Sequence, residues 1–179
     1  MKNVAVLVLL ILMSCKDTST TNEIIKSEVV PNVAQLEADR QFEVYDYDGL
    51  APLLNKTDGK VHIVNFWATW CAPCIKELPY FEAVNEKYKD KDVELLLVSL
   101  DFPIKYDTAL QPFIEKNNLK AKVVALDDVD QNRWIPAIAE EWSGAIPATI
   151  IYNNDKRQFY EKSFTQQELE TELKQFLKK

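Results

Sequence analysis

The sequence predicts an α/β fold, in which helices are layered against a β-sheet. Short apolar runs of strand length alternate with segments whose apolar residues recur at helical spacing, an order typical of layered α/β domains. The run over residues 93–100 is almost continuously apolar, as in a parallel strand that is covered on both faces. The chain has 179 residues, 47% of them apolar, and its last ~140 residues suffice for one domain with its own core.

The first residues predict an export signal. Lys2 gives a positive start, and residues 4–13 carry no charge. That run is too short to span a bilayer, which needs about 20 apolar residues, but it suits the core of a signal peptide. Ser14-Cys15 resembles the bacterial lipobox, which implies a lipoprotein signal peptide over residues 1–14, cleavage before Cys15 and a lipid on its sulfur. The alternative is an ordinary signal peptide with an incidental cysteine.

A polar stretch over residues 15–35 predicts a flexible tether. Such a chain has an end-to-end reach of about 25 Å. The apolar pairs at 24–25 and 29–30 could instead form a short strand. We therefore expect the folded domain to occupy residues 36–179.

The domain begins with signals for two strands. Residues 42–47 alternate in polarity, which predicts a half-buried strand, and residues 50–54 follow a turn and suit a short helix. Asp58-Gly59 predicts a second turn. The apolar run over residues 61–67 then predicts a buried strand.

The middle of the chain alternates strands and helices. Strands are predicted over 93–100 and 122–126, and helices over 108–118 and 130–142. Pro136 must lie in the first turns of the second helix or interrupt it.

The last part of the chain predicts a strand pair and a closing helix. Residues 147–151 form one strand, 153–155 suit a hairpin turn, and 157–164 form the last strand. Thr165 and Glu168 have the spacing of a capping box, and leucines at helical spacing follow.

Two cysteines lie where the 61–67 strand gives way to a helix. Cys71 and Cys74 are separated by Ala72-Pro73, so a disulfide between them could open and close with little backbone movement. The first turn of a helix has unpaired N–H groups and a positive dipole end, which favour the reactive thiolate. Zinc is the first alternative, but it needs about four ligands, and the chain has three cysteines and one histidine. A purely structural disulfide is the second, but so short a loop stabilises little.

Residues 65–74, Asn-Phe-Trp-Ala-Thr-Trp-Cys-Ala-Pro-Cys, resemble the active-site segment of thioredoxin-fold proteins. In particular they resemble that of the extracytoplasmic TlpA/ResA-like thiol-disulfide oxidoreductases. The resemblance extends over residues 42–179 and implies a thioredoxin fold. That fold has a central mixed β-sheet flanked by helices, here with an N-terminal strand extension and a central αβ insertion. Ile146-Pro147 resembles the family's cis-proline loop, which implies that both residues face the cysteines and bind substrate, with Trp70 at the rim.

The resemblance implies a dithiol/disulfide cycle in which Cys71 attacks and Cys74 resolves. Thioredoxin has a buried aspartate where this chain has Asn65, which cannot act as a base. Glu77 lies three residues after Cys74, on nearly the same helix face, and matches a glutamate of ResA-like proteins. We expect a carboxylate there, with a raised pKa, to act as the base; the alternative is an exposed residue that favours the helix dipole.

We expect a reductase of envelope-protein disulfides, because no charge in the spacer stabilises the thiolate further. The family suggests cytochrome c maturation as the setting, with a membrane thiol electron donor and an anchor that keeps the domain outside the cytoplasm, in the periplasm. The alternatives are a disulfide-forming oxidase or isomerase of exported proteins and a non-catalytic binding module. A peroxiredoxin would need Thr or Ser where Ala68 stands.

Nucleic acid is not an expected partner, because the formal net charge is −7. No metal and no cofactor beyond the Cys71–Cys74 pair are expected. We expect His62 to be a packed or edge histidine and Trp67 to lie in the core.

Overall fold

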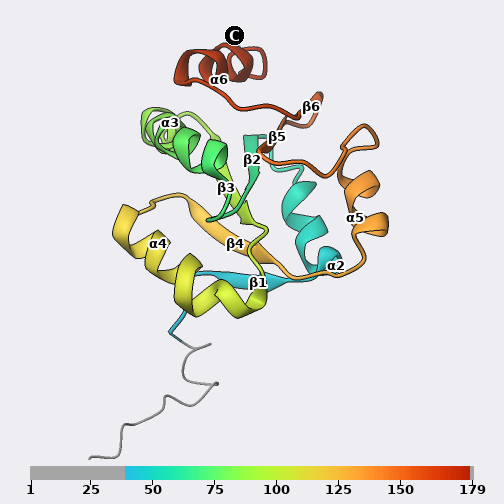
Figure 1. The fold of residues 1–179 in the computed structure, drawn as a ribbon. Helices are drawn as coiled ribbons and strands as arrows, with labels where there is room; N and C mark the ends of the chain where they lie inside the picture. The colour runs from blue at the N-terminus through green and yellow to red at the C-terminus, as the bar shows by residue number, and fades with distance from the viewer. Residues whose placement is uncertain (1–38, 178–179) are drawn as a thin grey trace, which may run out of the picture. The chain divides into compact units, whose positions relative to one another are not determined.

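The computed structural model describes residues 39–177. The signal peptide, Cys15 and the tether, predicted over residues 1–35, lie outside that range. One sheet of six strands organises the described part, in the order β1-β4-β3-β2-β5-β6 (Figure 1). The strands are β1 (Glu43–Tyr45), β2 (Val61–Trp67), β3 (Val93–Ser99), β4 (Lys122–Leu126), β5 (Ala148–Tyr152) and β6 (Arg157–Tyr160).

The sheet is mixed, as the sequence predicts. Neighbouring strands from β1 through β4 and β3 to β2 are parallel, whereas β5 is antiparallel to both β2 and β6. β1 adds to the edge next to β4, where it forms the predicted N-terminal extension.

Helices cover both faces of the sheet. They are α2 (Tyr47–Leu50), α3 (Ala72–Tyr88), α4 (Gln111–Asn117), α5 (Gln131–Ile138) and α6 (Gln166–Leu173). Buried residues of α3, α4 and α6 join one apolar cluster, and those of α2 and α5 join a second on the opposite face (Figure 1). In residues 39–177 we find no helix with the length and apolar character needed to cross a bilayer.

β2 lies near the centre of the sheet, and all of its side chains are buried. Because side chains alternate along a strand, Ile63 and Trp67 join the cluster under α3, whereas Val64 and Phe66 join the other cluster. Asn65 shares the face of Ile63 and Trp67. A polar residue of β2 is thereby buried beneath α3.

The bounds predicted for β2 and β4 are confirmed, as are the β5–β6 hairpin and the capping box of α6. Several predicted bounds are wrong. β1 ends at Tyr45 rather than 47, because Asp46 caps helix α2. α5 ends at Ile138 rather than 142, because Pro136 lies inside it and Ala139 is already extended. β6 ends at Tyr160 rather than 164, where the chain leaves the sheet towards α6.

The helix predicted over 108–118 is also more irregular than expected. A 3-10 turn (Pro103–Lys105) and a π-helical turn (Tyr106–Leu110) precede the regular helix α4. The π turn buries Tyr106 and Leu110 in the cluster beneath α3 and α4. The irregular part of the backbone is therefore the part that places Tyr106 and Leu110 in the core.

Candidate active site

Cys71 and Cys74 form a disulfide at the start of α3. Cys71 is the N-cap residue of the helix, and the N–H of Cys74 donates to its Sγ at 3.3 Å. Cys71 is 5% exposed and Cys74 fully buried. A backbone donor and the helix dipole thus both point at the more accessible sulfur, and both would stabilise a thiolate there.

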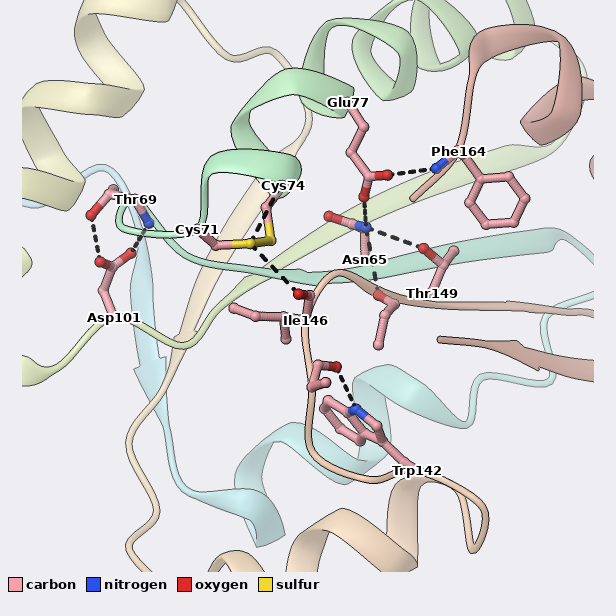
Figure 2. The surroundings of a disulfide bond; sticks show 12 residues. Asn65, Thr69, Cys71, Cys74, Glu77, Asp101, Trp142, Ile146, Thr149 and Phe164 are labelled. Carbon is pink, nitrogen blue, oxygen red and sulfur yellow. Dashed lines mark hydrogen bonds between the residues drawn. A yellow bond between two sulfur atoms is a disulfide. The ribbon is translucent and has the colours of Figure 1, made fainter. Parts of the chain in front are cut away.

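A loop on the other side of the disulfide brings Ile146 and Pro147 to the site. The peptide bond between them is cis, as the sequence predicts. Figure 2 shows the carbonyl oxygen of Ile146 directed at Cys71, with the oxygen 3.8 Å from Sγ. A hydrogen bond holds this loop in place, because Trp142 Nε1 donates to the carbonyl oxygen of Ala145 at 2.8 Å.

Glu77 lies on the face of α3 that points towards β2, and it is only 1% exposed. Its Oε1 accepts from Asn65 Nδ2 at 3.0 Å, and its Oε2 accepts from the backbone N–H of Phe164 at 2.7 Å (Figure 2). Asn65 Nδ2 also donates to Thr149 Oγ1 at 3.1 Å. The alternative of an exposed glutamate is therefore wrong.

Burial raises the pKa of Glu77 to about 7, and the hydrogen bonds from Phe164 and Asn65 oppose that rise. A pocket of about 280 Å³ is lined by Glu77 and also by exposed residues, among them Lys76 and Glu168. A carboxyl group with this pKa can bind or release a proton near neutral pH.

A second buried carboxylate, Asp101, was not predicted. It accepts from the backbone N–H of Thr69 at 2.9 Å, from Thr69 Oγ1 at 2.5 Å and from Ser99 Oγ at 2.8 Å. These bonds join the loop before Cys71 to the end of β3 (Figure 2). One signal in the sequence could have revealed it: an acidic residue just after a parallel strand lies at the same sheet edge as residues that follow the neighbouring strand.

The four tryptophans divide between core and surface. Trp67 is buried in the core as predicted, whereas Trp70, next to Cys71, is 58% exposed. Trp134 and Trp142 are both buried and contact each other edge to face at 5.6 Å. Of the four tryptophans, Trp70 is thus the exposed one, and it lies next to Cys71.

His62 lies at the opposite end of β2 from the cysteines, buried and stacked on Tyr152. Its Nε2 is 2.9 Å from Asp58, and these two residues and Glu94 form a group that could hold a metal ion. Lys56 and Lys60, however, pair with the Glu94 oxygens at 2.8 and 2.5 Å. His62 is a packed histidine in an ion-paired network, as the sequence predicts.

The structure therefore brings Cys71, Cys74 and Ile146 together, with Pro147 in the same cis peptide bond as Ile146 and Glu77 about one helical turn after Cys74 on α3. Trp70 adjoins them on the surface, and Cys15 lies outside the described residues.

Comparison with known proteins gives consistent results. Residues 36–157 match the AhpC/TSA family. The thiol-disulfide oxidoreductase ResA of Bacillus anthracis is 33% identical over 114 residues, which cover 64% of this chain and 61% of that protein. ResA of Geobacillus kaustophilus is 29% identical over 135 residues, 74% of this chain and 72% of that protein. The chain thus spans about three fifths of the Bacillus protein.

Solved structures share the fold. The crystal structure of a putative thiol-disulfide oxidoreductase from Bacteroides vulgatus is 30% identical, with a TM-score of 0.52, and the match covers 66% of this chain and 79% of that one. A thioredoxin-related protein from Neisseria meningitidis has a TM-score of 0.57 at 22% identity, covering 68% of this chain and 86% of that one, and shows the thioredoxin fold alone. By its match over residues 36–157, the chain belongs to the AhpC/TSA family.

Proposed function

We propose that this protein is a thiol-disulfide oxidoreductase that reduces disulfides of exported proteins by cycling Cys71 and Cys74 between dithiol and disulfide. The observation that carries the reaction class, as distinct from its direction, is the hydrogen bond from the Cys74 N–H to Cys71 Sγ at the start of α3. It favours the thiolate at the sulfur that faces the Ile146 loop. The names of the ResA relatives support the same reaction class.

The cycle starts from the dithiol. The Cys71 thiolate attacks one sulfur of a client disulfide, the client's S–S bond breaks, and its other sulfur leaves as a thiolate that takes up a proton. Cys74 then attacks Cys71 Sγ, which breaks the mixed disulfide and releases the second client thiol. Two electrons pass to the client, and the Cys71–Cys74 disulfide remains.

Glu77 is the base for the second step. Cys74 is fully buried, so its thiol resists ionisation, and it needs a nearby acceptor for its proton. A carboxyl group with a pKa of about 7 can accept that proton near neutral pH and pass it to water through the adjoining pocket.

The surroundings of the pair favour reduction of clients. Ala72 and Pro73 add no charge, and Glu77 and Asp101 are buried carboxylates close by. Negative charge disfavours a thiolate, so it favours the disulfide form of the protein and makes its dithiol the better reductant. We do not propose a peroxide-reducing activity, because Ala68 provides no hydroxyl group three residues before Cys71.

We further propose that a lipid on Cys15 holds the protein at a membrane, outside the cytoplasm. A membrane thiol protein would then return electrons to the Cys71–Cys74 disulfide, and apocytochrome c is the client that the resemblance to ResA-like proteins suggests. Labelling cells with a radioactive fatty acid tests the anchor. The label should appear on the wild-type chain and be absent from Cys15→Ser, and equal labelling of both would contradict the anchor.

Trapping of clients tests the reaction. Cys74→Ser should accumulate a mixed disulfide between Cys71 and client proteins that dithiothreitol releases, whereas Cys71→Ser should accumulate none. Failure of Cys74→Ser to trap any protein would instead support the non-catalytic binding module.

The reduction potential of the pair tests the direction of electron flow. A value near or below about −250 mV, measured against glutathione, is expected for a reductase. A value near about −120 mV would overturn the proposed direction and identify a disulfide-forming oxidase.

A further inference from the structure

Exposed apolar side chains gather at one edge of the sheet. Five large apolar residues are exposed in the part of the chain that the structure describes: Val44 (37%), Trp70 (58%), Phe102 (63%), Ile104 (81%) and Val129 (96%). Single exposed apolar residues are ordinary on protein surfaces. Four of these five, however, lie in the segments that directly follow β2, β3 and β4, Ile104 in the 3-10 turn after β3, and only Val44 lies within a strand.

These loops share one edge because β2, β3 and β4 are neighbours and run parallel. Trp70 follows β2, Phe102 and Ile104 follow β3, and Val129 follows β4. Cys71 is at the same edge, since it directly follows Trp70. The apolar residues therefore extend sideways from the disulfide, away from the Ile146 loop, which enters the sheet on the β5 side.

Direct bonds hold the first two loops together. The N–H of Leu100 donates to the carbonyl oxygen of Trp67 at 2.8 Å, and Thr69 is bound to the buried Asp101 through two donors. Trp70 and Phe102 are each one residue beyond these contacts. Their backbones are thus fixed next to each other, although both side chains remain exposed.

The dimensions suit a short polypeptide segment. Neighbouring strands lie about 4.8 Å apart, so the ends of β2 and β4 are about 10 Å apart. An extended chain covers that distance in about three residues. Asp127 and Asp130 are exposed on either side of Val129, so the far end of the row is acidic.

We infer that Trp70, Phe102, Ile104 and Val129 form an apolar docking row for the polypeptide segment next to the client's disulfide. The inference rests on the proposed function. When a client cysteine is bonded to Cys71, the client residues next to that cysteine lie against Trp70. From Trp70 the row follows the strands β2, β3 and β4, which are neighbours in the sheet. The segment that fits has two or three apolar or aromatic side chains near the cysteine and no acidic residue, because Asp127 and Asp130 would repel one.

Two synthetic peptides test the inference. Each has one cysteine joined by a disulfide to thionitrobenzoate, flanked by leucine and phenylalanine in one peptide and by serine in the other. Attack of Cys71 on the peptide sulfur breaks that disulfide, forms a Cys71–peptide disulfide and releases the coloured thionitrobenzoate anion. The full chain is used in its reduced form with Cys15→Ser, so that Cys71 and Cys74 are its only thiols.

The measured quantity is the ratio of the two second-order rate constants at limiting peptide concentration. We expect the apolar peptide to react about tenfold faster than the serine peptide, and the double substitution Phe102→Ser with Ile104→Ser to lower the ratio to about threefold or less. Because a ratio on one protein cancels any general loss of active material, partial misfolding cannot imitate this result. Val44→Ser is the matched control, and its ratio should equal that of the parent protein.

Other outcomes would overturn the inference. Equal rates with the two peptides, an undiminished ratio in the double variant, or an equal loss in Val44→Ser would each do so. If the double variant lost a dimer that the parent protein forms in sedimentation, while its ratio of rate constants stayed undiminished, the row would instead bind a second copy of this chain. No release from either peptide would contradict the proposed function itself.

Discussion

Two buried carboxyl groups lie near the disulfide, and their partners differ. Glu77 accepts two hydrogen bonds, from an amide side chain and a backbone N–H. Asp101 accepts three, two of them from hydroxyl groups. Glu77 also lines a pocket that exposed residues share. At the scale of single residues, Glu77 is therefore suited to exchange a proton and Asp101 to fix two loops.

Glu77→Gln should slow the release of a client from its disulfide with Cys71. Gln cannot accept the Cys74 proton, so we expect the release rate at pH 8 to fall about 100-fold. In the wild type the rate should also fall below pH ~7, as the carboxyl group becomes protonated. Rapid-quench measurement of release from a preformed mixed disulfide checks this.

Glu86→Gln provides the control, because Glu86 is an exposed residue of the same helix. A release rate that is equal in Glu77→Gln and Glu86→Gln would contradict a role for Glu77 as the base.

The raised pKa of Glu77 also predicts how stability depends on pH. The folded-state pKa of about 7 lies above the ordinary value of 4.5, so the folded protein binds an extra proton between these pH values. The unfolding free energy therefore falls as pH rises through this window, by about 3 kcal/mol in total. Urea unfolding should show this loss in the wild type relative to Glu77→Gln between pH 4.5 and 8, and parallel curves would rule it out.

Asp101→Ala should destabilise the protein by about 3 kcal/mol, because three donors from Thr69 and Ser99 lose their acceptor. Urea unfolding at pH 7 measures the change. Asp90→Ala, at an exposed position, should alter stability by less than about 0.5 kcal/mol. Similar small values for both variants would show that the Asp101 bonds add little.

At the scale of elements, the cap of α6 supports the active site. Thr165 Oγ1 accepts from the N–H of Glu168 at 3.3 Å, and Glu168 accepts in return from the N–H of Thr165 at 2.8 Å. The residue before this cap is Phe164, whose N–H donates to Glu77. The start of α6 thus positions a donor to the candidate base.

Thr165→Ala should lower the unfolding free energy by about 1 kcal/mol through loss of this cap. Thermal unfolding monitored by circular dichroism checks the expectation. Thr171→Ala is the control, since Thr171 lies exposed in the same helix and donates to the carbonyl oxygen of Gln167. If the two variants melted at the same temperature, the cap would be energetically unimportant.

Local signals predicted the elements whose limits are set locally. β2 and β4 have the predicted bounds because apolar runs flanked by turns define them, and the Thr165–Glu168 spacing correctly placed α6. The sequence allowed Pro136 to interrupt its helix but did not give the end of α5 at Ile138, and it did not predict the π turn before α4. At the π turn the chain buries Tyr106 against distant residues, which no local pattern reveals.

In the candidate site, too, the sequence predicted what local motifs specify and not what depends on long-range packing. Cys71, Cys74 and the Ile146–Pro147 bond carry motifs, and Glu77 could be placed by its helix spacing. The hydrogen bonds of Glu77 to Asn65 and Phe164 join residues 12 and 87 positions away. Such pairings depend on how α3, β2 and α6 pack together, so the sequence alone did not disclose them.

At the scale of the whole molecule, the net charge of −7 predicts how clients approach. A cationic peptide disulfide should react faster at low salt, because opposite charge increases the encounter rate. Raising the salt from about 20 to 500 mM should lower its rate constant about threefold to tenfold, since screening shortens the Debye length. An anionic peptide of equal length should show the opposite trend in stopped-flow measurements, and no salt effect on either peptide would contradict the prediction.

The hydrogen bond between Phe164 and Glu77 has a consequence for observing the protein at work. The donor is a backbone amide, so it gives one peak in a nitrogen–proton correlation spectrum. The Phe164 nitrogen lies 2.7 Å from Oε2 of Glu77. Because burial raises the pKa of Glu77 to about 7, the chemical shift of the amide proton should follow the charge of this carboxyl group near neutral pH. One resonance, 87 positions from Glu77 in the chain, could thus report each gain or loss of the proton in solution without any attached label.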